Sequence, residues 1–170
     1  MALSSGSCAE GVARTAHLSL CRRYRYALWR RWGAGPDVMF VGLNPSTADE
    51  EVDDPTIRRC ITFARTWGYG GLCMANLFAY RSTQPAEMLA QLDPVGPEND
   101  NYLVQLASEA GVVVAAWGRH GKHRGRHNAV SKMLSGLHYL RLTKDGYPSH
   151  PLYLQASLRP VAWETSCPES

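Results

Sequence analysis

The sequence predicts an α/β domain: a three-layer αβα architecture around a four-stranded, mainly parallel central sheet. Three segments of the 170-residue chain are almost continuously apolar, at residues 38–43, 71–77 and 112–116, which is typical of strands covered on both faces. Segments with the apolar spacing of helices lie between these strands. Strands that alternate with helices form successive βαβ units, and such units build a parallel sheet with helices on both sides.

The first half of the chain is expected to supply a leading strand, a buried strand and a helix. Residues 24–32 (YRYALWRRW) alternate in character, which predicts a strand at one edge of the sheet, ahead of the buried strand at residues 38–43. Aspartate is a good N-cap and proline is tolerated at the first helical position, so Asp54 and Pro55 begin a helix. The apolar stripe of this helix comprises Ile57, Ile61 and Ala64.

The second half continues the same alternation. After the buried strand at residues 71–77, a loop rich in turn residues leads to a helix at residues 101–110. The third buried strand, residues 112–116, is followed by a helix at residues 126–135. A fourth strand is expected at residues 137–142 (LHYLRL), where apolar and polar residues alternate.

Composition and charge limit the classes of protein that this chain can be. With 45% hydrophobic and 19% charged residues, it falls outside the disordered and fibrous classes. We expect one domain at residues 21–155, between disordered tails at residues 1–20 and 156–170. The net charge of +3 permits a polyanionic partner without requiring one. No apolar run reaches the length of a membrane span and no export signal is evident, so we expect a cytoplasmic monomer that does not bind membranes.

The cysteines argue against a metal or cofactor. Their number is odd, five, and no two form a CxxC pair, so neither a zinc site nor an iron–sulfur cluster is expected, and no cofactor is predicted. Cys60 and Cys73 are expected to be reduced thiols packed in the core.

Polar residues that directly follow the predicted strands are the first candidates for function, because doubly wound sheets bind ligands outside the carboxyl ends of their strands. Asn44 precedes Pro45, which restricts its backbone and holds its amide at the strand tip. Two interpretations stay open for Asn44: it orients a water or reads a ligand, or it forms a local turn. Asn76 ends an apolar strand, and its amide needs a partner from the backbone, the more ordinary solution, or from a ligand.

Two later loops also carry candidate residues. His150 precedes Pro151, so its backbone is restricted in the same way as that of Asn44. The loop after the third strand is the most basic segment of the chain and contains three glycines, which favours phosphate binding over a solvated flexible loop. Its cations and first histidine are Arg119, His120, Lys122, Arg124 and Arg126. A third interpretation, metal binding by His120, His123 and His127, lacks an accompanying acidic or cysteine ligand.

The order of these motifs resembles the uracil-DNA glycosylase superfamily. The matching segments are GLNPS, NLFAYRSTQP, VVVAAWGRHGK and HPLYL, each at the end of a predicted strand, and they span residues 38–154. Serine at position 46 replaces the glycine of the superfamily's first motif, and no iron–sulfur cysteine stands near Tyr80. A narrower signature, LNPSTAD, DDPTIRRC, NLFAYR, DPVGPEN and HPLYL, is also similar to an uncharacterised bacterial family, domain of unknown function 1643.

The resemblance to the glycosylases implies a strand order and a set of roles. The four central strands, numbered along the chain, would lie in the order 2-1-3-4. Asn44 would position the water that attacks the sugar, Asn76 would read the flipped base, and His150 would stabilise negative charge on the departing pyrimidine. The substrate would also contact Pro45, Ser46, Phe78, Leu152 and Tyr153, of which the last two would form a wedge in the DNA. The aromatic residue that stacks on the base would be Phe63, Trp67 or Phe78.

These roles imply a monofunctional DNA glycosylase-like N-glycosidase that removes an aberrant pyrimidine, uracil by default, from single- or double-stranded DNA. Neutral amides and an imidazole suit this chemistry, because it needs an oriented water and a stabilised leaving group. Phosphate contacts would come from the basic loop at residues 119–126 and from Arg22, Arg23, Arg25, Arg30 and Arg31. Against this, the acidic run at residues 49–54 would repel a phosphate backbone. The alternatives are a nucleotide- or nucleic-acid-binding protein of the same fold without glycosylase activity, and an unrelated small-molecule enzyme.

Overall fold

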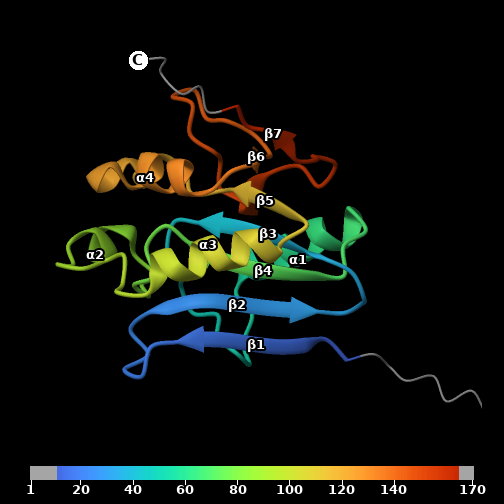
Figure 1. Cartoon of the computed structure of the whole chain (residues 1–170), viewed down its shortest axis with the longest axis horizontal. Coiled ribbons are helices and arrows are strands. Elements are labelled where there is room, and N and C mark those ends of the chain that lie inside the picture. Colours follow the sequence, from blue (N-terminus) through green and yellow to red (C-terminus); the bar gives the residue numbers. More distant parts are fainter. Residues whose placement is uncertain (1–10, 165–170) are drawn as a thin grey trace, which may run out of the picture.

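A seven-stranded mixed sheet runs through the protein, in the order β1-β2-β4-β3-β5-β6-β7 (Figure 1). The computed structural model describes residues 11–164. The strands are β1 (Ala13–Leu18), β2 (Arg25–Arg31), β3 (Asp37–Gly42), β4 (Gly71–Asn76), β5 (Val112–Ala115), β6 (Leu137–Tyr139) and β7 (Val161–Ala162). The α/β class predicted from the buried apolar runs is therefore confirmed.

The middle of the sheet is parallel. Strands β4, β3, β5 and β6 are neighbours in that order and run in the same direction, which is the order 2-1-3-4 for the four predicted strands. Every residue of β3 and β4 is buried, as expected for strands that are covered on both faces. The last of the four, β6, is shorter than predicted and ends at Tyr139.

The edges of the sheet differ from the prediction. Strand β2 is an interior strand, because β1 pairs with it on one side and β4 on the other, both antiparallel. The prediction that residues 1–20 form a tail is wrong for β1, whose polar residues belong to an edge strand held by its hydrogen-bond ladder to β2. On the opposite edge, β7 extends the sheet into the predicted tail at residues 156–170. Residues 1–10 and 165–170, with the rest of both predicted tails, lie outside the described part of the chain.

Helices cover both faces of the sheet, which gives the three predicted layers (Figure 1). Helices α2 (Pro85–Leu89), α3 (Asn99–Glu109) and α4 (Arg126–Met133) contribute to one apolar core. Helix α1 (Pro55–Thr66) and Leu154, which follows the short 3-10 helix η2 (Pro151–Tyr153), contribute to the core on the other face. Helix α2 was not predicted, because its five residues are too few to produce a periodic pattern.

Helix α1 begins as predicted. The Asp54 side chain caps it by accepting a hydrogen bond from the backbone N–H of Ile57 at 2.9 Å, and Pro55 occupies the first turn. Cys60 on this helix and Cys73 on β4 are buried free thiols, and burial raises the pKa of both well above the ordinary value. Cys8 and Cys167 lie outside the described residues. Between residues 11 and 164, none of the helices has both the length and the apolar character of a membrane span.

Candidate functional site

A cavity of about 290 Å³ lies at the carboxyl ends of β3, β4 and β5, on the face of the sheet covered by α1. Asn44, Asn76 and His150, which come from three separate loops or strand ends, all line it. We expected these three residues to lie close together because they follow parallel strands, whose carboxyl ends lie at one edge of the sheet. A volume near 300 Å³ is at the small end of the range for ligand sites, so the cavity suits a small molecule or one nucleotide unit.

Asn44 is held by two carbonyl oxygens. Its Nδ2 donates to the backbone oxygens of Ser82 at 2.9 Å and Pro45 at 3.1 Å. The backbone of Ser82 in turn donates to the Pro45 oxygen, so the loops after β3 and β4 are tied together here. Because both amide hydrogens have partners, the orientation of the amide is fixed and Oδ1 is left as its acceptor. Among residues 11–164, none donates a hydrogen bond to this oxygen.

Asn76 is the last residue of β4 and is 1% exposed. Its backbone oxygen accepts a hydrogen bond from Nδ2 of Asn99 on α3, at 2.9 Å, which fixes the strand end. Its own side-chain Nδ2 has no hydrogen-bond partner among the described residues. Gly42 lies opposite, and a Cβ at that position would come within 2.9 Å of Asn76 Oδ1, so glycine makes room for the amide. The interpretation that the Asn76 amide is satisfied by the backbone is therefore wrong.

His150 lies at the rim of the cavity, in the loop that leads into η2. The backbone of this loop is tied to neighbouring segments by bonds from Gly118 to Pro148 and from Ser149 to Arg141. The backbone N–H of Leu152 donates to His150 Nδ1 at 3.2 Å, so the neutral ring carries its proton on Nε2. Partial desolvation lowers the pKa of His150 below its ordinary value, although the nearby Asp54 carboxylate opposes the shift. The ring is therefore a neutral donor at pH 7.

Asp54 and Arg25 are charged residues in the same wall that sequence reasoning did not assign to the site. Asp54 is buried and uses Oδ1 to cap α1, while Oδ2 accepts no hydrogen bond from residues 11–164. Arg25 begins β2 and is 2% exposed, and its Nη1 donates to the Ala48 oxygen at 2.9 Å. Burial lowers the pKa of Arg25 to about 10, so it stays charged at neutral pH.

The remaining residues predicted to contact substrate divide into two groups. Ser46 and Leu152 line the cavity, as expected for residues that flank Asn44 and His150. Phe78 does not, because it is fully buried in the core on the opposite face, with its ring 5.9 Å from that of His123. Pro45 is buried and Tyr153 is 91% exposed, and neither lines the cavity. The prediction is therefore wrong for Phe78 as a pocket residue.

The basic loop at residues 119–126 contributes no residue to the wall of the cavity. The prediction that Arg126 binds phosphate is wrong, because Arg126 is buried and pairs with Asp100 at 2.5 Å and with the Leu77 oxygen at 2.8 Å. Arg124 donates to the backbone oxygens of Leu92 and Gln91, at 2.9 and 3.2 Å. Arg119 and Lys122 are exposed and His120 is partly exposed, so phosphate binding by these three stays a prediction.

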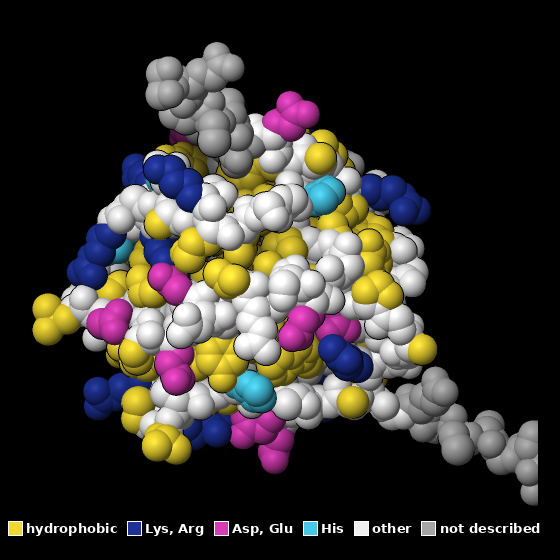
Figure 2. Space-filling view, viewed as in Figure 1, with side chains coloured by type: hydrophobic (Ala, Val, Ile, Leu, Met, Phe, Trp, Pro, Cys, Tyr) yellow, Lys and Arg dark blue, Asp and Glu magenta, His cyan; other side chains and the backbone are white. Residues whose placement is uncertain are grey.

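On the side of the molecule that carries α2, α3 and α4, Lys and Arg side chains lie dispersed around the margin among Asp and Glu (Figure 2). The alternative of a metal site has no support in the described part of the chain, where no group of three or more His, Cys, Asp or Glu is placed to hold an ion.

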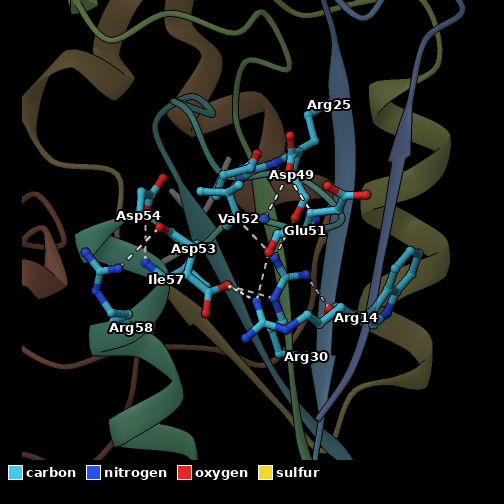
Figure 3. Close-up of polar contacts among 12 residues, drawn as sticks. Arg14, Arg25, Arg30, Asp49, Glu51, Val52, Asp53, Asp54, Ile57 and Arg58 are labelled. Carbon is cyan, nitrogen blue, oxygen red and sulfur yellow. Dashed lines mark hydrogen bonds and ion pairs between the residues drawn. The ribbon is translucent and has the colours of Figure 1, made fainter. Parts of the chain in front are cut away.

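The arginines of the leading strand have mostly internal partners (Figure 3). Arg30 is fully buried and pairs with Asp53 at 2.8 Å, and Arg31 pairs with Asp37 at 2.7 Å. Because Arg25 and Arg30 are buried, the prediction that they contact DNA phosphates is wrong. Part of the acidic run at residues 49–54 is correspondingly paired: Arg30 and Arg14 contact Asp53, and Arg22 contacts Glu50.

An open groove adjoins the cavity and shares Ser46, Ser82 and Thr83 with it. It carries the side chains of Arg22, Arg23 and Arg81. Arg22 and Arg23 belong to the arginine group predicted from the sequence, whereas Arg81 was missed. The only sequence signal for Arg81 was its position five residues after a strand-ending asparagine.

The two wall residues that were not predicted, Asp54 and Arg25, have sequence contexts that are typical of other roles. Asp54 has the sequence context of a helix cap, and it is one. Arg25 looked like the outward-facing residue of an edge strand, and its burial depends on the loop at residues 44–54 folding over β2.

Comparison with known proteins places the chain in a family. The family model described as "Protein of unknown function (DUF1643)" matches residues 25–152, a range that includes every wall residue named above. No curated protein and no solved structure matches the chain.

Proposed function

We propose that this chain, which belongs to the DUF1643 family, is an N-glycosidase that removes a pyrimidine base, uracil by default, from DNA. One observation carries the proposal: Asn44, Asn76 and His150 line one cavity, and each has a polar atom that no residue between 11 and 164 binds. Of these atoms, Nδ2 of Asn76 is buried, and a buried polar group is costly unless a ligand satisfies it.

The available atoms match the needs of a leaving pyrimidine. Nδ2 of Asn76 and Nε2 of the neutral His150 are both hydrogen-bond donors, and the carbonyl oxygens of a pyrimidine are acceptors. Apolar wall residues, Ile57, Met74, Ala116 and Leu152, provide surfaces for a planar ring. When the bond between the sugar and the base breaks, negative charge develops on those carbonyl oxygens, and the fixed donors stabilise it.

A hydrogen-bond acceptor and a negative charge in the cavity wall act on the water and the sugar. Oδ1 of Asn44 is a fixed acceptor that can orient a water molecule for attack on the anomeric carbon. The second oxygen of Asp54 supplies a negative charge in the same wall, which favours both the loss of a proton from that water and the positive charge that develops on the sugar. No covalent intermediate is required.

The adjoining groove supports a polymeric substrate over a free base. Arg22, Arg23 and Arg81 lie beside the cavity mouth, where the phosphates that flank an extruded nucleotide would run. In this proposal the groove takes over the role that the sequence suggested for the loop at residues 119–126.

A strand-cleavage assay tests the proposal. Oligonucleotides that carry uracil, hydroxymethyluracil, hypoxanthine or a mismatched thymine are incubated with the protein and treated with alkali, which breaks the chain wherever a base has been lost. We expect breaks at uracil, and a loss of roughly 100-fold or more in rate for Asn44→Ala and for His150→Ala. Asn101→Ala and His138→Ala, outside the cavity, are the matched controls and should cleave normally.

The binding of the same oligonucleotides separates the alternatives. Retained DNA binding in the two cavity variants, with cleavage lost, supports the proposed roles. Salt-sensitive binding by the wild type with no cleavage of any substrate would instead favour a nucleic-acid-binding protein of the same fold, and the glycosidase proposal would be abandoned.

A further inference from the structure

Arg25 is a buried cation without an anionic partner. It is 2% exposed, and no carboxylate oxygen of the described residues lies within 4.0 Å of its guanidinium nitrogens. One bond, from Nη1 to the Ala48 oxygen, is the only hydrogen bond that its side chain makes to the described residues, and Nε has none. Arg25 nevertheless forms part of the cavity wall, together with Asn76 and Asp54.

The other buried arginines of the protein are paired. Arg30 bonds Asp53 at 2.8 Å and Arg126 bonds Asp100 at 2.5 Å, and each also donates to backbone oxygens. A buried charge is costly unless it is paired and hydrogen-bonded. The exception, Arg25, is the one of these three that lines the cavity, so its missing partner is expected to come from a ligand.

We propose that Arg25 holds the pyrimidine base as an anion, so that the cavity prefers the leaving group in its charged form. This inference rests on the proposed N-glycosidase reaction. There the bond between the sugar carbon C1′ and the base nitrogen N1 breaks, and its electron pair stays on N1 of the base. Water supplies the new oxygen on C1′, and the proton that it loses passes to the Asp54 carboxylate. The base therefore departs as an anion, whose charge is shared by its carbonyl oxygens, and the Arg25 guanidinium neutralises it.

The wall favours a base anion over a phosphate at this position. Asn76, with an unpartnered Nδ2, lines the same cavity as Arg25, so two donors are available to one ligand, while Met74 and Ile57 present apolar surface. A planar anion fits such a mixture, whereas a tetrahedral phosphate requires donors on several sides. Phosphates have their own arginines in the adjoining groove, Arg22, Arg23 and Arg81.

Calorimetric titration with free pyrimidines tests the inference without requiring turnover. The probes are uracil, which is neutral at pH 7, and barbituric acid and 5-nitrouracil, which are anions at that pH. We expect the wild type to bind the two anions at least about tenfold more tightly than uracil, because charge-assisted hydrogen bonds are roughly twice as strong as neutral ones. In Arg25→Met this preference should fall to near one, whereas Arg58→Met, an exposed arginine on α1, should keep it.

Equal affinity of the wild type for the three pyrimidines would overturn the inference, and this result does not depend on whether Arg25→Met folds. An anion preference that Arg25→Met retains would also overturn it, as would displacement of barbituric acid by inorganic phosphate at similar concentration. Cleavage of uracil-containing DNA without any anion preference would contradict only this inference. An anion preference that depends on Arg25, in a protein that cleaves no DNA, would contradict only the proposed reaction.

Discussion

Arg30 and Arg25 are both buried charges, but only Arg30 forms an ion pair with an aspartate of the neighbouring loop. Arg30 pairs with Asp53, whereas Arg25 and Asp54 remain unpaired within the described part of the chain. Both arginines come from β2 and reach the loop that follows β3, and both aspartates come from that loop (Figure 3). Arg30 pairs with Asp53 at 2.8 Å and also donates to the oxygens of Trp29, Asp49 and Val52. Arg25 and Asp54 are both buried, yet they form no ion pair within 4.0 Å among the described contacts, and both line the cavity.

The difference separates a structural charge from a functional one. A buried ion pair in which each guanidinium nitrogen donates a hydrogen bond fixes the position of a loop, and its cost of desolvation is offset within the protein. A buried charge with donors left over lowers stability unless something else binds to it, and such groups concentrate in functional sites. The same strand therefore anchors the loop with one arginine and equips the cavity with the other.

Removal of the structural cation should have the largest effect on stability. Arg30→Met removes a donor from three backbone oxygens and leaves Asp53 with Arg14 as its partner, and we expect a loss of about 3 kcal/mol in the free energy of unfolding. Urea denaturation followed by circular dichroism measures it. A change of less than about 1 kcal/mol would mean that the Arg30 cluster does not hold the loop.

Substitution of the two aspartates should separate stability from activity: Asp54→Asn should affect mainly the rate of base release, and Asp53→Asn mainly the free energy of unfolding. Asparagine caps helices as well as aspartate does, so Asp54→Asn should leave stability within about 0.5 kcal/mol while it lowers the rate of base release roughly 100-fold. Asp53→Asn, with the charge removed beside Arg30, is the matched variant and should lose stability with less effect on the rate per folded molecule. Equal rates in the two variants would argue against a role for Asp54 in the reaction.

The cavity arginine should be dispensable for folding. Arg25→Met loses one bond, to the Ala48 oxygen, but it also removes a desolvated charge, whose cost is evident in the lowering of the Arg25 pKa to about 10. We expect the free energy of unfolding without ligand to change by less than about 1 kcal/mol or to rise. If Arg25→Met were as unstable as Arg30→Met, Arg25 would be a structural residue and the contrast between the two would fail.

The smallest expected effect is a shift in the pH dependence of the rate of base release. Since desolvation lowers the pKa of His150, the ring stays neutral to a more acidic pH than an ordinary histidine, and protonation would take Nδ1 away from the Leu152 N–H. The rate should therefore be constant through neutral pH and fall only at a pH below the ordinary value of 6.5. His150→Gln should remove this acid limb. An acid limb centred above 6.5 would contradict a neutral His150.

The sequence was sufficient to predict the parallel middle of the sheet and the convergence of three site residues on one cavity. Continuous apolar runs identify β3, β4 and β5 because strands buried on both faces need apolar residues at every position. Asn44, Asn76 and His150 were found because residues after parallel strands share one edge.

The errors in the roles of site residues have one physical origin, tertiary partners that local composition does not reveal. Arg126 was assigned to phosphate from its basic neighbours, but its partner, Asp100, comes from α3. Phe78 stands two residues after Asn76, yet the chain turns its ring to the opposite face of the sheet. The roles of Arg25 and Arg30 depend on the loop that folds over β2, and no periodicity within β2 distinguishes the two residues.

The claim on which both proposals depend is that a nucleobase occupies the cavity, and a crystal structure of the protein with free uracil tests it most directly. We predict the ring between the Asn44 and His150 loops, with its carbonyl oxygens within hydrogen-bond distance of Asn76 Nδ2 and the Arg25 guanidinium. An empty cavity at a saturating concentration of uracil, or a ring bound elsewhere with both groups still unpartnered, would contradict the account.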